Sequence, residues 1–212
     1  MLRRLRSRKV FGIGLSRTGT TSLHAALEQL GLRSVHFPSD PLTREEIEGF
    51  LATGGDSLRL SVLKRCDGLT DTPVCATFEA LDAAYPGSRF VLTVREKEPW
   101  LRSCEAYWRG GIDPFLRDHP NDPYAIYMSA IGGALYGSAR FDPECFSRAY
   151  DDYAKRVAGH FRGRDRDLLV LDLFSGQGWP ELCAFLDRPA PDAPFPSENP
   201  AVTRSPASSH PL

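Results

Sequence analysis

A glycine-rich segment near the N-terminus has the residue types and spacing of an anion-binding loop. Gly14 and Gly19 show the G-x-x-x-x-G spacing of a Walker A loop, but Thr20 replaces the lysine that follows in that motif. Arg17 is the only cation inside the loop. Such a loop suits a terminal phosphate or sulfate with less charge than a triphosphate. The candidate anion ligands are Ser16, Arg17, Thr18, Gly19, Thr20, Thr21 and Ser22.

A second pair of residues with anion-binding chemistry lies further along the chain. Arg95 follows the apolar run 89–94, and Ser103 comes eight residues later. Ligands of open parallel sheets bind at the carboxyl ends of the strands, which is where Arg95 is expected. An arginine at a strand end and a serine on the next helix can hold another phosphate through charge-assisted hydrogen bonds.

Alternating apolar and amphipathic segments predict the elements that position these residues. Strands are expected at 9–14, 34–37, 89–94 and 168–171, with a short one after Gly68. Helices are expected between them. The pattern predicts an α/β fold, a three-layer sandwich with a mostly parallel sheet and a P-loop, and a helical insertion near residues 105–163. We expect a single domain over residues 1–188 and an extended, Pro-rich C-terminal tail over residues 189–212.

The composition excludes several classes of function. The chain has 212 residues and a net charge of −1, which argues against a protein that coats nucleic acid. No apolar run approaches the ~20 residues that span a bilayer. The five cysteines form no C-x-x-C pair, so neither a disulfide framework nor a metal site is expected, and a reducing cytoplasm fits best. The Arg-rich residues 3–9 are expected to be a solvated lead-in to the first strand.

Two alternatives to a loop that binds one terminal phosphate or sulfate stay open. Residues 168–172 have the form of a Walker B strand, so a P-loop kinase that uses ATP–Mg²⁺ would place Asp172 on the metal. Thr20 in the lysine position argues against it. A non-catalytic nucleotide-binding module is the other alternative, favoured if no proton acceptor faces the bound anion. A dinucleotide fingerprint is excluded because its third glycine is missing.

Taken together, these motifs resemble the sulfotransferases that use 3′-phosphoadenosine 5′-phosphosulfate (PAPS), in a compact microbial-type branch. Residues 14–22 look like the family's 5′-phosphosulfate loop, and Arg95 with Ser103 looks like its 3′-phosphate motif. The resemblance covers most of residues 9–200 and extends through the segments 68–73, 85–87 and 178–186. It implies PAPS as the sulfuryl donor and the hydroxyl or phenol of a small molecule as acceptor.

The resemblance also implies roles for single residues. Arg17 would stabilise the bridging oxygen, residues 18–22 would bind the 5′-phosphosulfate, and Arg162 with Arg164 is a weak stand-in for a late basic segment at the 3′-phosphate. His36 and Asp71 are the two candidates for the base. A histidine side chain ordinarily has a pKa near neutral pH. Asp71 can orient the imidazole of His36 or stabilise its protonated form.

Residues 107–141 are rich in aromatic and glycine residues. They predict either an acceptor-side lid or the aromatic core of a helical insertion. The aromatic residues concerned are Tyr107, Trp108, Tyr124 and Tyr127. His24, one helical turn before Glu28, is expected to pair with that residue on the helix surface.

Overall fold

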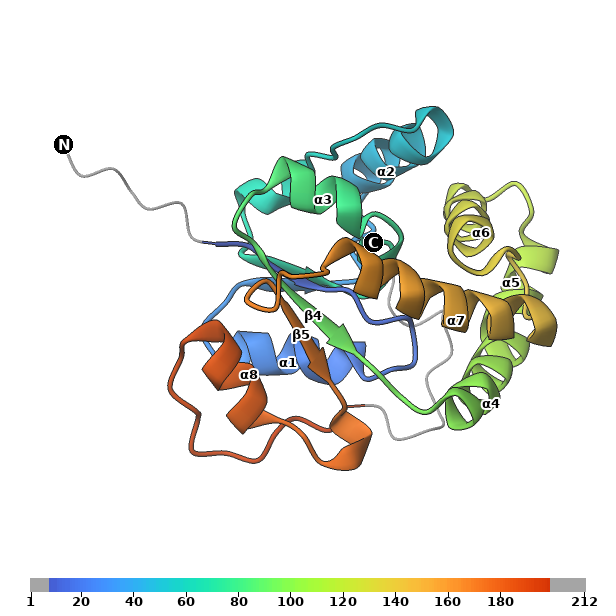
Figure 1. The fold of residues 1–212 in the computed structure, drawn as a ribbon. Helices are drawn as coiled ribbons and strands as arrows, with labels where there is room; N and C mark the ends of the chain where they lie inside the picture. Colours follow the sequence, from blue (N-terminus) through green and yellow to red (C-terminus); the bar gives the residue numbers. More distant parts are fainter. Residues whose placement is uncertain (1–7, 199–212) are drawn as a thin grey trace.

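The computed structural model describes residues 8–198, which fold around a five-stranded parallel sheet in the order β2-β3-β1-β4-β5 (Figure 1). Val10 pairs with Gly68 on one side and with Arg89 on the other, so β1 is the central strand. The predicted α/β class is confirmed, and every strand of the sheet is parallel. The strands are β1 (Val10–Gly12), β2 (Ser34–His36), β3 (Gly68–Thr70), β4 (Arg89–Thr93) and β5 (Leu168–Leu171).

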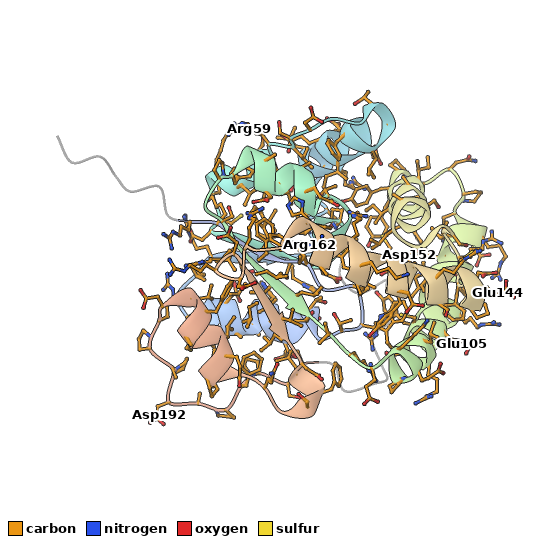
Figure 2. The ribbon with its side chains drawn as sticks, in the orientation of Figure 1. Arg59, Glu105, Glu144, Asp152, Arg162 and Asp192 are labelled. Atoms are coloured by element: carbon orange, nitrogen blue, oxygen red, sulfur yellow. The ribbon has the colours of Figure 1, made fainter. Side chains whose placement is uncertain are left out.

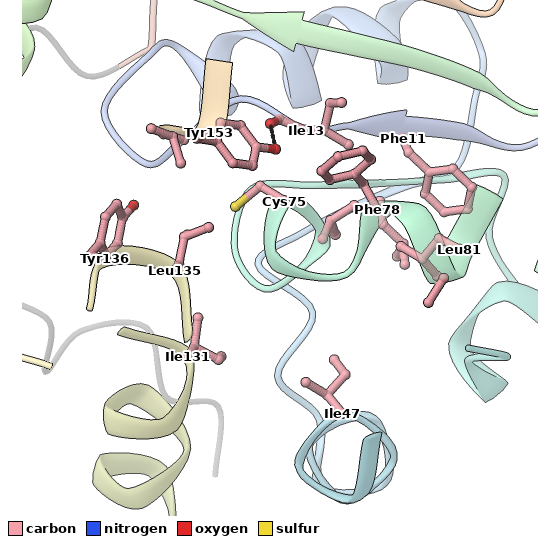
Figure 3. Close-up of a cluster of buried hydrophobic side chains, with 14 of the residues drawn as sticks. Phe11, Ile13, Ile47, Cys75, Phe78, Leu81, Ile131, Leu135, Tyr136 and Tyr153 are labelled. Carbon is pink, nitrogen blue, oxygen red and sulfur yellow. Dashed lines mark hydrogen bonds between the residues drawn. The ribbon is translucent and has the colours of Figure 1, made fainter. Parts of the chain in front are cut away.

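Helices cover both faces of the sheet, because successive strand residues point to opposite sides. Val10 and Val91 pack with α1 and α8, whereas Phe11 and Phe90 pack with α3 and α7. Figures 1 and 3 show these layers and part of the larger core cluster. The α-helices are α1 (Thr20–Gln29), α2 (Pro41–Thr53), α3 (Phe78–Ala84), α4 (Lys97–Tyr107), α5 (Asp113–Asp118), α6 (Pro123–Tyr136), α7 (Pro143–His160) and α8 (Trp179–Leu186).

The predicted helical insertion lies between β4 and β5 and is made of α4 to α7. Helix α4 continues into one π-helical turn, Trp108–Ile112, before α5 begins. The insertion has an aromatic core in which Tyr136 stacks on Phe146 at 4.3 Å and Trp108 meets Tyr136 edge-on. This core fixes the helices that stand beyond the carboxyl ends of the strands (Figure 1).

Three Asp-Pro pairs begin helices in or beside the insertion. The carboxylates of Asp40, Asp122 and Asp142 accept hydrogen bonds from backbone N–H groups of the first turn, and proline occupies the first helical position. Aspartate satisfies a free N–H group there, and proline has no N–H to leave unsatisfied. This local chemistry explains why α2, α6 and α7 begin where they do.

The described part of the Pro-rich segment, residues 189–198, forms neither helix nor strand and packs on the domain. Trp179 Nε1 donates to the carbonyl of Ala193 at 2.8 Å, and Phe195 lies 4.8 Å from the Trp179 ring. Glu198 N–H donates to Ser22 Oγ at 3.0 Å. The rest of the predicted tail and residues 3–7 of the Arg-rich lead-in lie outside the described residues. Within residues 8–198, no helix is both long and apolar enough to cross a membrane.

Candidate active site

The glycine-rich loop connects β1 to α1 and turns sharply at two positions. Arg17 and Gly19 both have positive φ angles, 73° and 97°. Gly14 approaches β4 so closely that a Cβ there would overlap the Thr93 hydroxyl. Gly19 is the N-cap of α1 and has no side chain to cap it, so the positive end of the helix dipole faces the loop. Backbone geometry therefore prepares this helix end for an anion.

Thr18 braces the loop from inside. Its Oγ1 donates to the carbonyl of Leu15 at 2.7 Å and contacts Thr93 Oγ1 at 2.7 Å. The side chain is 2% exposed and does not line the cavity above the loop. The Thr18 hydroxyl therefore holds the loop in shape, and the role of Thr18 as an anion ligand stays a prediction.

The insertion supports the loop through aromatic donors. Tyr153 Oη donates to the carbonyl of Ile13 at 2.6 Å, and Trp100 Nε1 donates to the carbonyl of Ser16 at 2.9 Å. Tyr150 Oη holds the carbonyl of Arg95 in the same way, at 2.6 Å. These bonds fix backbone atoms that no regular strand or helix would satisfy. The loop and the end of β4 are therefore rigid relative to α4 and α7.

Two guanidinium groups meet beside the open end of α1. Arg17 Nε donates to Ser103 Oγ at 3.1 Å, and Arg95 Nη1 donates to the carbonyl of Arg17 at 3.4 Å. Arg95 Nε is buried without a hydrogen-bond partner. Burial and then the charge of Arg17 lower the pKa of Arg95. The structure thus brings together the predicted Arg17, Arg95 and Ser103.

Neither guanidinium forms an ion pair with a carboxylate among residues 8–198. Instead, each lies over an aromatic ring: Arg17 is 5.0 Å from the centroid of Tyr107, and Arg95 is 4.5 Å from that of Phe174. Cation–π contacts hold a guanidinium in place and leave its outer N–H donors for a ligand. Two adjacent cations without a counter-charge are costly in the absence of an anion, and an anion between them would remove that cost.

His36 and Asp71 face each other at the ends of β2 and β3. His36 pairs in register with Thr70, so the next residue of β3's chain, Asp71, lies beside the imidazole. His36 Nε2 is 3.4 Å from Asp71 Oδ2 and 3.3 Å from Thr21 Oγ1. The other ring nitrogen, Nδ1, is 3.0 Å from Thr70 Oγ1. The two base candidates therefore form one unit.

Ser16 links this unit to the loop. Its Oγ donates to Asp71 Oδ1 at 2.9 Å and lies 3.2 Å from Thr72 Oγ1. The carboxylate of Asp71 is consequently held at one oxygen by the anion loop and faces histidine with the other. This arrangement places a proton acceptor next to the predicted anion site.

His24 forms the expected contact with Glu28, with 3.7 Å between Nε2 and Oε2, but it is not a surface residue. Its ring stacks on His36 with 5.6 Å between centroids, and its Nδ1 is buried without a partner. Burial lowers the pKa of His24, and the charge of His36 adds to that effect while Glu28 opposes it. His24 therefore presents an imidazole to the back of the His36 ring.

A cavity of about 1460 Å³ lies over the loop. Its wall includes Arg95, Phe174 and Phe195, from the end of β4, the segment after β5 and the Pro-rich segment. The part of the wall formed by the insertion, here called the insertion half, includes Tyr107, Trp108, Tyr124 and Tyr136. The predicted site residues that line the cavity are Ser16, Arg17, Gly19, Thr20, Thr21, Ser22, His36, Asp71, Arg95 and Ser103.

Tyr127 follows the second of the two alternatives given for the aromatic stretch 107–141. It is fully buried and its Oη donates to the carbonyl of Pro38, so it belongs to the core and not to the cavity wall. The proposed stand-in for a late basic segment is a prediction that the structure corrects. Arg162, labelled in Figure 2, and Arg164 lie between α7 and β5, before the amino end of that strand, whereas the loop follows the carboxyl end of β1. Arg164 binds Asp82 and Asp167 there, so this pair does not complete the anion site.

Asp172 follows β5 and caps the short 3₁₀ helix Leu173–Ser175. Its Oδ1 accepts from the N–H groups of Phe174 and Ser175 at 3.0 and 3.2 Å. Strand β4 separates β5 from β1, so this carboxylate is not beside the loop strand. Among the described residues, no cluster of three or more His, Cys, Asp or Glu side chains has the arrangement of a metal site.

Sequence reasoning missed three parts of the cavity wall. Tyr136 lies at the end of α6, and its position depends on how that helix packs. Phe195 belongs to a segment whose composition indicated only extended chain. Arg102 lines the cavity one residue before Ser103. Only Arg102 carried a sequence signal, as a further cation beside the predicted pair.

A parallel sheet with a glycine loop between its central strand and the next helix defines the class of P-loop α/β proteins. The chain belongs to the sulfotransferase family, because the family model described as "Sulfotransferase domain" matches residues 9–203. This finding confirms the resemblance to sulfotransferases.

Two known proteins illustrate the relationship. The chain is 30% identical over 215 residues to Ava biosynthesis cluster protein M from Aspergillus versicolor, with 89% of this chain and 79% of that protein covered. The crystal structure of a sulfotransferase from Alicyclobacillus acidocaldarius matches 87% of this chain and 84% of its own, at 16% identity and a TM-score of 0.48.

Proposed function

We propose that the protein transfers a sulfuryl group from PAPS to the hydroxyl of a small molecule. The observation that carries this proposal is the meeting of Arg17 and Arg95, without carboxylate partners among residues 8–198, at the uncapped end of α1. PAPS has two separate anionic groups, and the buried, unpartnered Nε of Arg95 fits a phosphate ligand. When bound, PAPS supplies the sulfuryl group, whose sulfur–oxygen bond to the 5′-phosphate breaks.

The loop residues stabilise the charge that develops on the leaving phosphate. The first N–H groups of α1 and the guanidinium of Arg17 point at one place, and fixed donors of this kind lower the barrier without reorganising. Removing one such donor typically lowers turnover by about 10²–10³. Arg95 and Ser103 bind the 3′-phosphate by charge-assisted hydrogen bonds, and Arg95 is held for this by Phe174 and the carbonyl of Arg17.

The His36–Asp71 unit removes the proton of the acceptor hydroxyl. Asp71 is fixed by Ser16 and faces His36, so the unit can take a proton on either member without moving the loop. A positioned base of this kind contributes about 10²–10⁴ in rate. The site thus holds an anion-binding loop and a proton acceptor side by side, which a non-catalytic binding module would not need.

Calorimetric titration with adenosine 3′,5′-bisphosphate (PAP) and with ATP–Mg²⁺ tests this proposal. We expect PAP to bind much more tightly than ATP–Mg²⁺, because the Walker A lysine is replaced by Thr20 and Asp172 is used as a helix cap. Tight binding of ATP–Mg²⁺ without binding of PAP would overturn the proposal in favour of a kinase.

The variant Arg95→Ala sharpens the titration. A charge-assisted hydrogen bond contributes roughly 1.5–3 kcal/mol, so PAP affinity should fall about 10- to 100-fold while adenosine 5′-phosphate is affected much less. Arg109→Ala is the matched control, because Arg109 pairs with Glu105 on the surface of the insertion. Equal weakening of both nucleotides by Arg95→Ala would show that Arg95 does not bind the 3′-phosphate.

A further inference from the structure

Tyr136 is the buried polar group that the proposed chemistry does not yet use. Its side chain is 3% exposed and lines the cavity. Its Oη makes no hydrogen bond of ordinary geometry with any described residue, and the polar side chain that approaches it is Ser16. Nearly all buried hydroxyl groups in proteins have a partner, so an orphan that faces a cavity indicates a ligand. Figure 3 shows this hydroxyl projecting from the end of α6.

The ring of Tyr136 is fixed on several sides. Phe146 stacks on it at 4.3 Å with an interplanar angle of 8°, and Trp108 meets it edge-on at 5.5 Å. Trp100 approaches at 6.4 Å. A ring clamped in this way keeps its hydroxyl where it is, so the position of Oη is set by the core of the insertion.

The hydroxyl lies in the same part of the cavity as the proton acceptor. Asp71, Tyr107, Tyr124 and Tyr136 line the same cavity, and Ser16, which approaches Tyr136, donates to Asp71 Oδ1 at 2.9 Å. Burial raises the pKa of Tyr136, so it stays protonated at neutral pH and can donate. Asp71 accepts and Tyr136 donates, which are the two complementary partners of an alcohol oxygen.

The walls of the insertion half favour an uncharged molecule. The rings of Phe37, Tyr107, Trp108 and Tyr124 line the insertion half with Met128 and Ile131, and none of these carries a charge. The charged groups beside them are Asp71 and Arg17, and the guanidinium of Arg17 is held over the Tyr107 ring next to the anion loop. A carboxylate entering this half would meet Asp71. An ammonium group would pair with Asp71 and block its use as a proton acceptor. Flat aromatic walls also match the faces of an aromatic ring.

We propose that Tyr136 binds the acceptor oxygen and that the acceptor is an uncharged alcohol with an aromatic body. The inference rests on the proposed function. The hydroxyl donates its proton toward the His36–Asp71 unit and accepts a hydrogen bond from Tyr136 Oη, which leaves one lone pair directed at sulfur. The new oxygen–sulfur bond forms as the bond from sulfur to the 5′-phosphate oxygen breaks. The acceptor proton passes to the His36–Asp71 unit, and Tyr136 keeps its own proton.

Three phenols of nearly equal size test the acceptor class. The probes are 4-ethylphenol, tyramine and 4-hydroxyphenylacetate, which are neutral, cationic and anionic, and the readout is PAP formed from PAPS. We expect kcat/KM to be highest for 4-ethylphenol, by tenfold or more over each charged probe. Equal or better turnover of a charged probe, or turnover of none of the three, would overturn the inference. PAP binding measured in parallel separates that failure from a failure of the proposed function.

Tyr136→Phe tests the hydrogen bond itself. The variant should weaken the binding of 4-ethylphenol to the PAP-saturated protein by about three- to tenfold, the usual range for one neutral hydrogen bond, and leave PAP affinity unchanged. Tyr127→Phe is the matched control, since Tyr127 is a buried tyrosine of the same helix that donates to Pro38 outside the cavity. An equal loss in both variants, or no loss in Tyr136→Phe, would overturn the role of Tyr136.

Discussion

At the scale of single residues, the site separates its charges in an unusual way. Arg17 and Arg95 lie together without a carboxylate among the described residues, although Asp71 is attached to the same loop through Ser16. Ser16 and His36 contact the two oxygens of the Asp71 carboxylate. In the proposed function, the cations bind the anionic donor and the carboxylate takes part in accepting the proton. In-line transfer from an anion to a hydroxyl requires this separation of charges.

Removing either member of the His36–Asp71 unit should slow the chemical step and leave donor binding intact. We expect His36→Ala and Asp71→Asn each to lower kcat by about 10²–10⁴, because the acceptor proton loses its positioned base. PAP affinity, measured by calorimetry, should change little. His119→Ala serves as the control, since His119 is exposed on the insertion and does not line the cavity. Full turnover in both site variants would exclude the unit as the base.

At the scale of elements, periodicity and turn chemistry were enough to predict the sheet and most helices. The strand expected at 168–171 has those bounds in the structure, and helices lie between the strands as expected. Buried parallel strands read as short apolar runs, and caps mark helix starts, so both features are local in sequence. The loop residues could be predicted for the same reason, because one strand–turn–helix unit contains them.

The residues that line the insertion half of the cavity could not be predicted in the same way. Tyr136 lines the cavity and Tyr127 does not, although both are tyrosines of α6. Which side of α6 faces the cavity depends on its packing against the next helix, α7, and against α2, which is far away in the sequence. The stacking of His24 on His36 similarly requires that α1 and β2 pack together. Such contacts are tertiary, and a helical repeat alone does not determine them.

The N-cap of α6 can be tested for its contribution to the stability of the protein. Asp122 Oδ1 accepts from the N–H groups of Tyr124 and Ala125 at 2.7 and 3.3 Å. Loss of such a cap costs about 1 kcal/mol, so Asp122→Ala should lower the free energy of urea unfolding by that amount. Asn121→Ala, at the exposed neighbouring position, should leave it unchanged. Equal stability of the two variants would contradict the assigned cap.

At the scale of the whole molecule, charged side chains are paired differently at the two ends of the strands, here called the amino edge and the carboxyl edge of the sheet. At the amino edge, Arg33 pairs with Asp67, with 3.0 Å between Nε and Oδ2, and Arg164 pairs with both Asp82 and Asp167. At the carboxyl edge, Arg17 and Arg95 have no such partners among residues 8–198. A net charge of −1 therefore conceals a basic site at one edge and neutralised pairs at the other. Ion pairs contribute to folding stability at the amino edge. At the carboxyl edge, Arg17 and Arg95 have no such pairs and can bind an anionic ligand.

The ion pairs at the amino edge predict that folding stability depends on pH, and this dependence does not involve the residues of the anion loop. Hydrogen bonds from Arg33 lower the pKa of Asp67 to about 2. Burial alone would raise the pKa of Asp82, but hydrogen bonds from Arg164 and His160 outweigh it and lower that pKa. Carboxyl groups with a lowered folded-state pKa add stability above their unfolded pKa of about 4, and that stability is lost as the pH falls toward the folded value.

Urea unfolding at a series of pH values from 7 down to about 2 measures this loss. The free energy of unfolding should fall with pH below about 4, and Asp67→Asn should lower stability at pH 7 but reduce the acid-dependent loss. Asp56→Asn removes the same charge from an exposed residue that forms no ion pair with any described residue, so its pH profile should follow that of the parent protein. PAP affinity at pH 7 should be the same in both variants, because Asp67 lies at the edge of the sheet opposite the loop. A profile of Asp67→Asn that parallels the parent at every pH would show that the Arg33–Asp67 pair contributes nothing to acid sensitivity.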